Sequence, residues 1–281
     1  MNLWLIGASQ MAQDYAKVLN TLDFQFEVIG RGVGSASNFF NSTGLKVQTG
    51  GVHQALKDLH VPETAIVAVG VEQLSEVATV LIKSGTSRIL LEKPGGLNFE
   101  QIHKLNDVAT EHGAKVWLAY NRRFYASTLK AEEMIAEDGG VTSVQFDFTE
   151  WSHRICDMVK APGVKEHWFL GNSTHVVDLV FHLCGTPKDW RSWFDGSLDW
   201  HPSASRFAGA GIMNNGALFS YLADWEAPGR WGIEILSRKH RLIFRPMEQL
   251  QVTELGSVKV NQIMIDDRLD QAYRPGLYRQ T

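Results

Sequence analysis

Short, uninterrupted aliphatic runs alternate with helical patterns over the first 120 residues. The aliphatic runs lie at residues 2–6, 26–30, 64–70, 88–92 and 114–120, and the helical patterns lie at residues 11–22 and 71–85. Apolar runs without alternation are typical of strands that are covered on both faces. Their alternation with helices predicts a parallel, doubly wound sheet.

From about residue 140 onward the pattern changes to strand-like alternation of apolar and polar positions. Predicted strands lie at residues 141–151, 217–226, 230–237 and 241–246, and one helix is predicted at residues 173–185. We therefore predict an α/β protein of two domains. Residues 1–120 form a nucleotide-binding domain, and residues 121–281 form an α+β domain with a large, mostly antiparallel sheet. The cleft between such domains is the default ligand site.

Composition narrows the range of partners and compartments. The formal net charge is −4 and no basic stripe occurs, which argues against nucleic acid or a membrane surface as a partner. No apolar stretch approaches the roughly 18 residues of a membrane span, and the start lacks the basic region of a signal peptide. Cys156 and Cys184 have neither metal nor redox spacing. We expect a cytoplasmic protein without a metal.

The loop after the first strand only partly matches the dinucleotide pattern G-x-G-x-x-G. Its six positions are Gly7, Ala8, Ser9, Gln10, Met11 and Ala12. The first glycine is present and alanine is tolerated in the last place, but Ser9 adds a side chain near the expected phosphates. The helix start still offers unpaired N–H groups to a phosphate. The loop is therefore a candidate cofactor site, with an ordinary strand–helix turn as the alternative.

The end of the second strand favours NADP(H) over NAD(H). A domain that prefers NAD usually carries an acid there, whereas this chain has Arg31, with Ser35 close behind. A guanidinium binds a 2′-phosphate as a fork and can stack on adenine. The alternative is a solvated arginine in a glycine-rich loop, so NAD(H) stays open as the cofactor.

Lys93 directly follows the strand at residues 88–92, so it should emerge at the carboxyl edge of the sheet. Pro94 restricts the backbone and aims the lysine, and the bond between them is a candidate cis peptide. A lysine with a lowered pKa in a cleft can bind a substrate hydroxyl and relay its proton. The alternative is an exposed lysine on a loop.

The helix at residues 173–185 carries His175, Asp178 and His182 on one face. His175 lies in the first turn and its ordinary pKa suits proton exchange near neutral pH. Asp178 can orient His175 or contact a ligand. A metal site lacks a clear fourth ligand, so we predict none. A purely structural His175 remains an alternative.

Three motifs together resemble the Gfo/Idh/MocA family. They are Glu92-Lys93-Pro94 after a βαβαβ half, the segment Tyr-Asn-Arg-Arg-Phe at residues 120–124, and the helix with His-x-x-Asp. This resemblance implies an N-terminal Rossmann domain and an open C-terminal sheet that often forms a dimer or tetramer interface. It also implies hydride transfer between a nicotinamide and a sugar, cyclitol or nucleotide-sugar.

Carried onto this chain, the resemblance assigns roles to matching positions. Lys93 would polarise the reacting oxygen, with Glu92 beside it near the cofactor, and His175 would be the general acid/base. Residues expected between nicotinamide and substrate are Tyr120, Asn121 and Arg122.

Three positions depart from the family pattern. Many relatives carry aspartate where this chain has Gly171. Asn172 could bind a substrate hydroxyl but cannot take up a proton, and Asn172 or Ser173 could equally be the helix N-cap. His182 replaces an aromatic residue and is expected to be structural. Relatives also continue beyond the segment at residues 273–280, so either this member is short or a tail is missing.

Aromatic and basic residues on predicted loops flank this helix. They are Trp151, His153, Arg154, Lys165, His167 and Trp168. Aromatic faces hold sugar rings, and tryptophan also packs well for purely structural reasons. We select Trp151 and Trp168 as substrate-binding candidates. The arginines and lysines could instead bind the diphosphate of a nucleotide-sugar.

The leading interpretation is an NAD(P)-dependent dehydrogenase or reductase. A non-catalytic NAD(P)-binding sensor on the same fold is the alternative from another class, and it would account for the altered loop and the absent acid. An NAD-dependent glycosidase or epimerase, which oxidises its substrate transiently, is a third reading.

Overall fold

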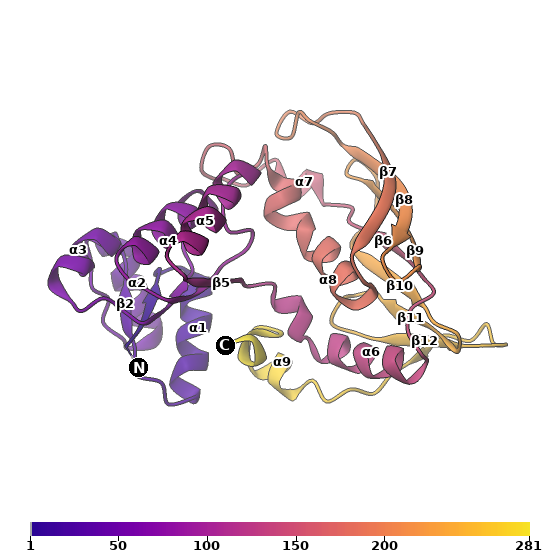
Figure 1. Ribbon diagram of the computed structural model, residues 1–281, viewed down its shortest axis with the longest axis horizontal. Coiled ribbons are helices and arrows are strands. Elements are labelled where there is room, and N and C mark those ends of the chain that lie inside the picture. The colour runs from indigo at the N-terminus through magenta and orange to yellow at the C-terminus, as the bar shows by residue number, and fades with distance from the viewer. Residues whose placement is uncertain (1) are drawn as a thin grey trace. The chain divides into compact units, whose positions relative to one another are not determined.

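The computed structural model describes residues 2–281, which form two compact units (Figure 1). The first unit runs to Ala119 and includes Leu277–Thr281, and the second unit is Tyr120–Gly276. The predicted division after residue 120 assigned residues 277–281 to the second domain, whereas in the structure they lie with the first. The side-chain amide of Gln280 donates a hydrogen bond of 2.8 Å to the Tyr15 hydroxyl there.

A five-stranded parallel sheet forms the centre of the first unit, as the sequence predicts. The strand order is β2-β1-β3-β4-β5. The strands are β1 (Leu3–Ile6), β2 (Glu27–Ile29), β3 (Thr64–Val67), β4 (Arg88–Leu91) and β5 (Lys115–Leu118). Trp4 and Leu5 in the interior strand β1 are fully buried, because helices cover both faces of the sheet. The doubly wound prediction is confirmed.

The helices of the first unit include three that the sequence analysis did not assign. The helices are α1 (Gln10–Thr21), α2 (Val33–Thr43), α3 (Gly51–Asp58), the short 3₁₀ helix η1 (Val71–Gln73), α4 (Leu74–Lys83), α5 (Phe99–Glu111) and α10 (Leu277–Gln280). The apolar stripe of α1 packs on the sheet, since Tyr15, Val18 and Leu19 are buried. Helices α2, α3 and α10 were not predicted.

The second unit contains an eight-stranded sheet in the order β13-β12-β11-β10-β6-β9-β8-β7. The strands are β6 (Ser143–Asp147), β7 (Pro187–Asp195), β8 (Arg206–Met213), β9 (Leu218–Asp224), β10 (Gly232–Leu236), β11 (His240–Phe244), β12 (Gln251–Glu254) and β13 (Asn261–Gln262). Neighbours are antiparallel except β6 and β9, which run parallel. The prediction of a large, mostly antiparallel sheet is confirmed, although β7, β8, β12 and β13 were not assigned.

One face of this sheet is covered by helix α8 (Figure 1). The helical segments of the unit are η2 (Asn121–Phe124), α6 (Ala126–Glu137), α7 (Ser152–Ile155), the π-helical turn η3 (Phe169–Ser173), α8 (Thr174–Cys184) and α9 (Arg268–Ala272). Val176, Leu179 and Val180 of α8 are buried in the core under the sheet. On the opposite face Leu218 and Leu222 are exposed. His153 and Arg154 were expected on a loop but lie in α7.

None of the helices formed by residues 2–281 combines the length and apolarity needed to cross a membrane.

Candidate functional site

The loop between β1 and α1 has a backbone shape that requires glycine at its first position. Gly7 has φ of +127°, a region that side chains with a Cβ rarely adopt. A Cβ at Gly7 would also overlap the carbonyl oxygen of Ala68 on the neighbouring strand. Ser9 is the N-cap of α1, and its hydroxyl lies 3.4 Å from the same carbonyl oxygen. The loop therefore keeps the tight turn of a dinucleotide site, and its serine hydroxyl has a partner within the protein.

A hollow of about 200 Å³ lies at the carboxyl ends of β1, β2 and β3. Its lining includes Gly7, Gly30, Arg31, Gly50, His53 and Gln73. The structure thus brings the predicted residues Gly7 and Arg31 together, whereas Ser35 is exposed on α2 and hydrogen bonds to the Gly32 carbonyl oxygen. The hollow has the position of a nucleotide site in an open α/β sheet. Its residues fit the adenosine part of a nicotinamide dinucleotide.

The sequence analysis did not find the wall of this hollow that α3 provides. Gly50 and Gly51 both have positive φ, and Gly51 begins α3, whose third residue is His53. The pair of glycines at residues 50–51 was the available signal, because adjacent glycines mark a turn that can approach a ligand closely.

Lys93 lies where β4 ends, as predicted, and the Lys93–Pro94 peptide bond is cis. The Glu92 N–H continues the strand ladder to the Val67 carbonyl oxygen at 2.9 Å, and a turn then closes from the Gly95 N–H to the Glu92 carbonyl oxygen at 3.1 Å. The Tyr15 hydroxyl donates to the Glu92 carboxylate at 2.9 Å. Since parallel strands end at one edge, Lys93 shares that edge with Gly7 and Arg31.

The start of α5 fixes the loop that follows Lys93. The Asn98 side chain accepts a hydrogen bond of 3.0 Å from the Gln101 N–H. In return the Gln101 side chain accepts one of 2.8 Å from the Leu97 N–H. This reciprocal cap satisfies two N–H groups at the helix start and gives the loop a defined path back into the sheet layer.

In the second unit, His175 occupies the first turn of α8 and is 6% exposed. The Tyr120 ring meets its imidazole edge to face at 5.8 Å between ring centroids, and the Trp231 ring lies at 6.0 Å. The Tyr120 hydroxyl donates to the Thr174 hydroxyl at 3.2 Å. Burial raises the pKa of Tyr120 above its ordinary value, so this residue is a neutral hydroxyl. Aromatic rings on two sides hold the imidazole in place.

Asp178 is engaged by Arg123. The Arg123 Nε donates to the Asp178 carboxylate at 2.8 Å, and a second guanidinium nitrogen also binds it. This fork raises the pKa of Arg123, chiefly through the hydrogen bonds to Asp178. His182 pairs with Glu132 at 2.9 Å, which agrees with the structural role expected for it. The role of Asp178 toward His175 or a ligand stays a prediction.

A buried carboxylate that the sequence analysis missed holds the segment before His175. Glu150, 2% exposed, accepts hydrogen bonds from four side chains. The donors are the Asn172 amide at 2.9 Å, the Ser173 hydroxyl at 2.8 Å, the Arg230 guanidinium at 2.7 Å and the Trp231 indole at 3.2 Å. Ser173 is the N-cap residue of α8, as one of the two alternatives had it, but neither the Asn172 nor the Ser173 side chain makes a capping hydrogen bond to the helix. They tie η3 to the end of β6 instead.

The remaining substrate candidates lie in different surroundings. The buried Asn121 amide donates to the Pro275 carbonyl oxygen at 2.9 Å. Trp168 is partly buried and packs edge to face against Trp200. Trp151 is 40% exposed, and its indole N–H donates to the Gly229 carbonyl oxygen. Of the three, Trp151 offers the largest accessible ring.

Across the described residues, 2–281, no three histidine, cysteine, aspartate or glutamate side chains gather as a metal site would require. Cys156 is exposed and Cys184 is buried, and both are free thiols. Burial raises the pKa of the Cys184 thiol to about 12, so this residue behaves as a small apolar side chain.

Two comparisons with known proteins give matches, one for residues 1–120 and one for the fold of the whole chain. Residues 1–120 match the model of an oxidoreductase family with an NAD-binding Rossmann fold, named GFO_IDH_MocA. A comparison with curated protein sequences gives no match.

Solved structures resemble the whole chain. An NAD-binding oxidoreductase from Klebsiella pneumoniae is 16% identical, with a TM-score of 0.76 over 100% of this chain and 82% of the other. UDP-N-acetylglucosamine 3-dehydrogenase from Acidithiobacillus ferrooxidans is 15% identical, with 0.74 over 99% and 86%. A levoglucosan dehydrogenase in complex with NADH and L-sorbose is 17% identical, with 0.74 over 99% and 82%. At these identities the likeness shows the fold.

Proposed function

We propose that the protein is an NAD(P)-dependent oxidoreductase, because residues 1–120 match the model of an oxidoreductase family with an NAD-binding Rossmann fold. It transfers a hydride between a nicotinamide and a carbon that carries the hydroxyl of a sugar, cyclitol or nucleotide-sugar. The observation that carries the proposal is Lys93 at the carboxyl edge of the same sheet that presents Gly7 and Arg31.

The side chains of this chain supply the proton and oxygen chemistry of the proposed reaction. The Lys93 ammonium donates to the reacting oxygen and stabilises negative charge as it develops there. His175 takes up or returns the proton, since imidazole exchanges protons near neutral pH. When bound, the nicotinamide supplies the hydride or accepts it. Gly171 contributes no side chain, so the acid that many relatives carry has no counterpart at that position.

The cofactor preference is NADP(H). Arg31 lines the hollow at the end of β2, and among the described residues the only acid of the lining is Glu76, which belongs to α4 and not to β2. A guanidinium there suits a 2′-phosphate. We expect Arg31→Ala to weaken NADPH binding about 10-fold or more and to leave NADH binding nearly unchanged, since a charged hydrogen bond contributes about 1.5–3 kcal/mol. Equal loss for both cofactors would contradict this preference.

The experiment that tests the function combines cofactor binding with turnover. Fluorescence titration with NADH and NADPH measures binding, and absorbance at the nicotinamide band measures turnover across neutral, acidic and nucleotide-linked sugars. Lys93→Met should abolish turnover while cofactor affinity is retained. Lys104→Met, an exposed lysine on α5, is the matched control. Cofactor binding without turnover of any sugar would instead identify a sensor.

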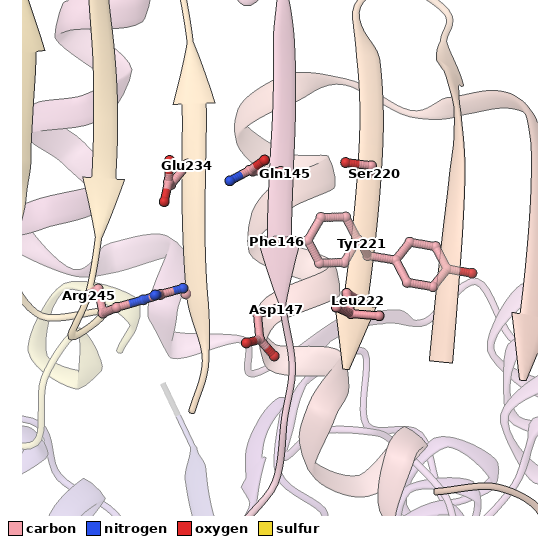
Figure 2. A pocket seen from close by; sticks show the side chains of 9 residues that line it. Gln145, Phe146, Asp147, Ser220, Tyr221, Leu222, Glu234 and Arg245 are labelled. Atoms are coloured by element: carbon pink, nitrogen blue, oxygen red, sulfur yellow. The ribbon is translucent and has the colours of Figure 1, made fainter. Parts of the chain in front are cut away.

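The open face of the eight-stranded sheet is the proposed homo-oligomer interface. Trp193, Leu218 and Leu222 are exposed on it. Figure 2 shows side chains that line a hollow on the same face: Asp147 and Leu222 come from the adjacent strands β6 and β9, and Arg245 directly follows β11. The volume of the hollow is about 300 Å³. Exposed apolar residues on a flat face are typical of an interface between subunits. Leu222→Arg should convert a dimer or tetramer into a monomer in light scattering, and a wild-type monomer would contradict the proposal.

A further inference from the structure

Three arginines and two tryptophans from separate segments of the second unit stack on one another. We call these residues the arginine–tryptophan cluster: Arg122, Trp151, Arg154, Arg230 and Trp231. The Arg154 guanidinium lies 4.7 Å from the Trp151 ring centroid, and Arg230 lies 5.0 Å from the same ring. Arg230 also lies 4.1 Å from Trp231, and Arg122 lies 4.7 Å from Trp231. Stacking fixes the plane of each guanidinium and leaves its N–H edge able to donate.

The positive charge of this cluster exceeds its negative charge. Arg230 pairs with Glu150 at 2.7 Å. Within residues 2–281 neither Arg122 nor Arg154 forms an ion pair, and the Arg122 Nε is buried without a hydrogen-bond partner. Burial lowers the pKa of Arg122. Tyr125 and Glu248 nearby act in the opposite direction, and the charges of Arg230 and Arg274 lower the pKa further. A buried donor without an acceptor is costly unless a ligand supplies one.

Of the acids around the cluster, Glu150 and Asp178 are already engaged by the protein, whereas Glu248 acts electrostatically on Arg122. Glu150 accepts from four donors, and Asp178 is held by the fork of Arg123. A neutral sugar hydroxyl both donates and accepts, so a site for it needs free acceptors as well as donors. An anionic oxygen only accepts. Three guanidinium groups face only two carboxylates, Glu150 and Glu248, so the cluster suits an anionic ligand better than a neutral polyol.

We infer that the substrate of the proposed reaction carries an anionic group, phosphoryl or carboxylate, which Arg122 and Arg154 bind. The inference rests on the proposed function. Arg122 and Arg154 stand at the two ends of the stacked series, with Arg230 between them. The accessible ring of Trp151 beside Arg154 can stack on a base or sugar attached to the anionic group.

Calorimetric titration of the full-length protein tests the inference. The probes are UDP-N-acetylglucosamine, UDP, glucose 6-phosphate and glucuronate, compared with the neutral myo-inositol and levoglucosan, at low and high salt. We expect the anionic probes to bind and the neutral ones not to bind, with affinity that falls as salt rises. Binding of UDP but not of glucuronate would identify the group as phosphoryl, and the reverse would identify it as carboxylate.

Two variants locate the binding group. Arg122→Gln and Arg154→Gln should each weaken the bound anion about 10- to 100-fold, the loss expected for a charge-assisted hydrogen bond. The control is Arg268→Gln, which removes an exposed arginine that pairs with Asp266, and it should bind as wild type does. Arg154 is exposed, so its variant should keep the wild-type melting temperature even where Arg122→Gln does not.

The outcomes separate this inference from the proposed function. Three results would overturn the inference: neutral sugars that bind as tightly as the anions or more tightly, no binding of any anion, or anion binding that is unchanged in both arginine variants. In each case turnover with NAD(P) would still uphold the proposed oxidoreductase. Absence of NADH and NADPH binding would overturn the proposed function, while the anion titrations would still report on Arg122 and Arg154.

Discussion

Replacement of Glu150 tests whether one buried carboxylate holds together the segment that leads into the His175 helix. Its two oxygens accept from donors in two other segments: Asn172 and Ser173 in η3, and Arg230 and Trp231 before β10. Glu150→Ala removes every acceptor at once. Glu150→Gln keeps the shape and one carbonyl oxygen but removes the charge.

The size of the effect follows from which donors can find water. Removing one partner of a buried ion pair costs about 3–5 kcal/mol, because the other charge stays desolvated. The Arg230 side chain is 39% exposed and can regain some hydration, whereas the Trp231 and Ser173 donors are buried and cannot. We therefore expect Glu150→Ala to lower the free energy of unfolding by about 3–4 kcal/mol, and Glu150→Gln by about 1–3 kcal/mol.

Urea unfolding followed by tryptophan fluorescence measures this change. Seven of the nine tryptophans lie in the second unit, so the signal reports mainly on that unit. Glu254→Gln on β12, an exposed carboxylate, is the control and should change stability by less than about 0.5 kcal/mol. A double-mutant cycle with Arg230→Gln should give a coupling of about 0.5–3 kcal/mol. A loss below about 1 kcal/mol in Glu150→Ala would refute the reasoning.

Two further predictions concern the first and second units separately. Gly7→Ala should lower NADH affinity and should lower the free energy of unfolding by about 1–3 kcal/mol, because Gly7 has φ of +127° and a Cβ there would clash. The control in melting and titration experiments is Gly34→Ala, which has open space around it. Burial alone would raise the pKa of Asp138, but hydrogen bonds with Ser237 and His240 lower it below its ordinary 3.8. The ionised carboxylate thus stabilises the fold above about pH 4 and loses this effect as pH falls through the lowered pKa. The stability deficit of Asp138→Asn should therefore shrink in acid. A deficit that does not change between pH 7 and pH 2 would contradict this prediction.

The chemistry at strand ends was predictable because it needs little tertiary information. Aliphatic runs without alternation mark parallel strands, and the carboxyl ends of such strands meet at one edge. Gly7, Arg31 and Lys93 could therefore be assigned to one edge of a sheet from their places in the chain, and the structure has them there. The family model over residues 1–120 supports the same reading.

The wall that α3 gives to the hollow was missed, as was α2, because both helices have weak local signals. Helix α2 is rich in serine, asparagine and glycine, which are poor helix formers, and only Phe39 is buried. Helix α3 has eight residues and starts at a glycine. Both helices are stabilised by packing rather than by propensity. His53 could not be placed in the hollow without α3.

Strands β7 and β8 were missed for a different reason. Their formation depends on the strands beside them and not on a pattern in their own residues. Every residue of β7 after its first is exposed, so burial imposes no alternation on the strand. In β8, Gly209 and Gly211 lie where a Cβ would meet the Tyr221 and Phe219 rings of β9. Glycine is a poor strand former locally, but these neighbours require it. The sequence shows the two glycines of β8, but it does not show that aromatic rings of β9 pack against them.

Glu150 also sharpens what the absence of an acid at position 171 means. A carboxylate does lie close by, since it binds Asn172 and Ser173, but it is 2% exposed and accepts from four donors. Taking a proton would break at least one of these hydrogen bonds and leave the Arg230 charge unpaired. Glu150 is therefore a poor candidate for the missing proton acceptor. If the proposed reaction occurs, its proton has to pass through His175 or Lys93, and the pH profile of kcat should respond to His175→Gln but keep its shape in Glu150→Gln.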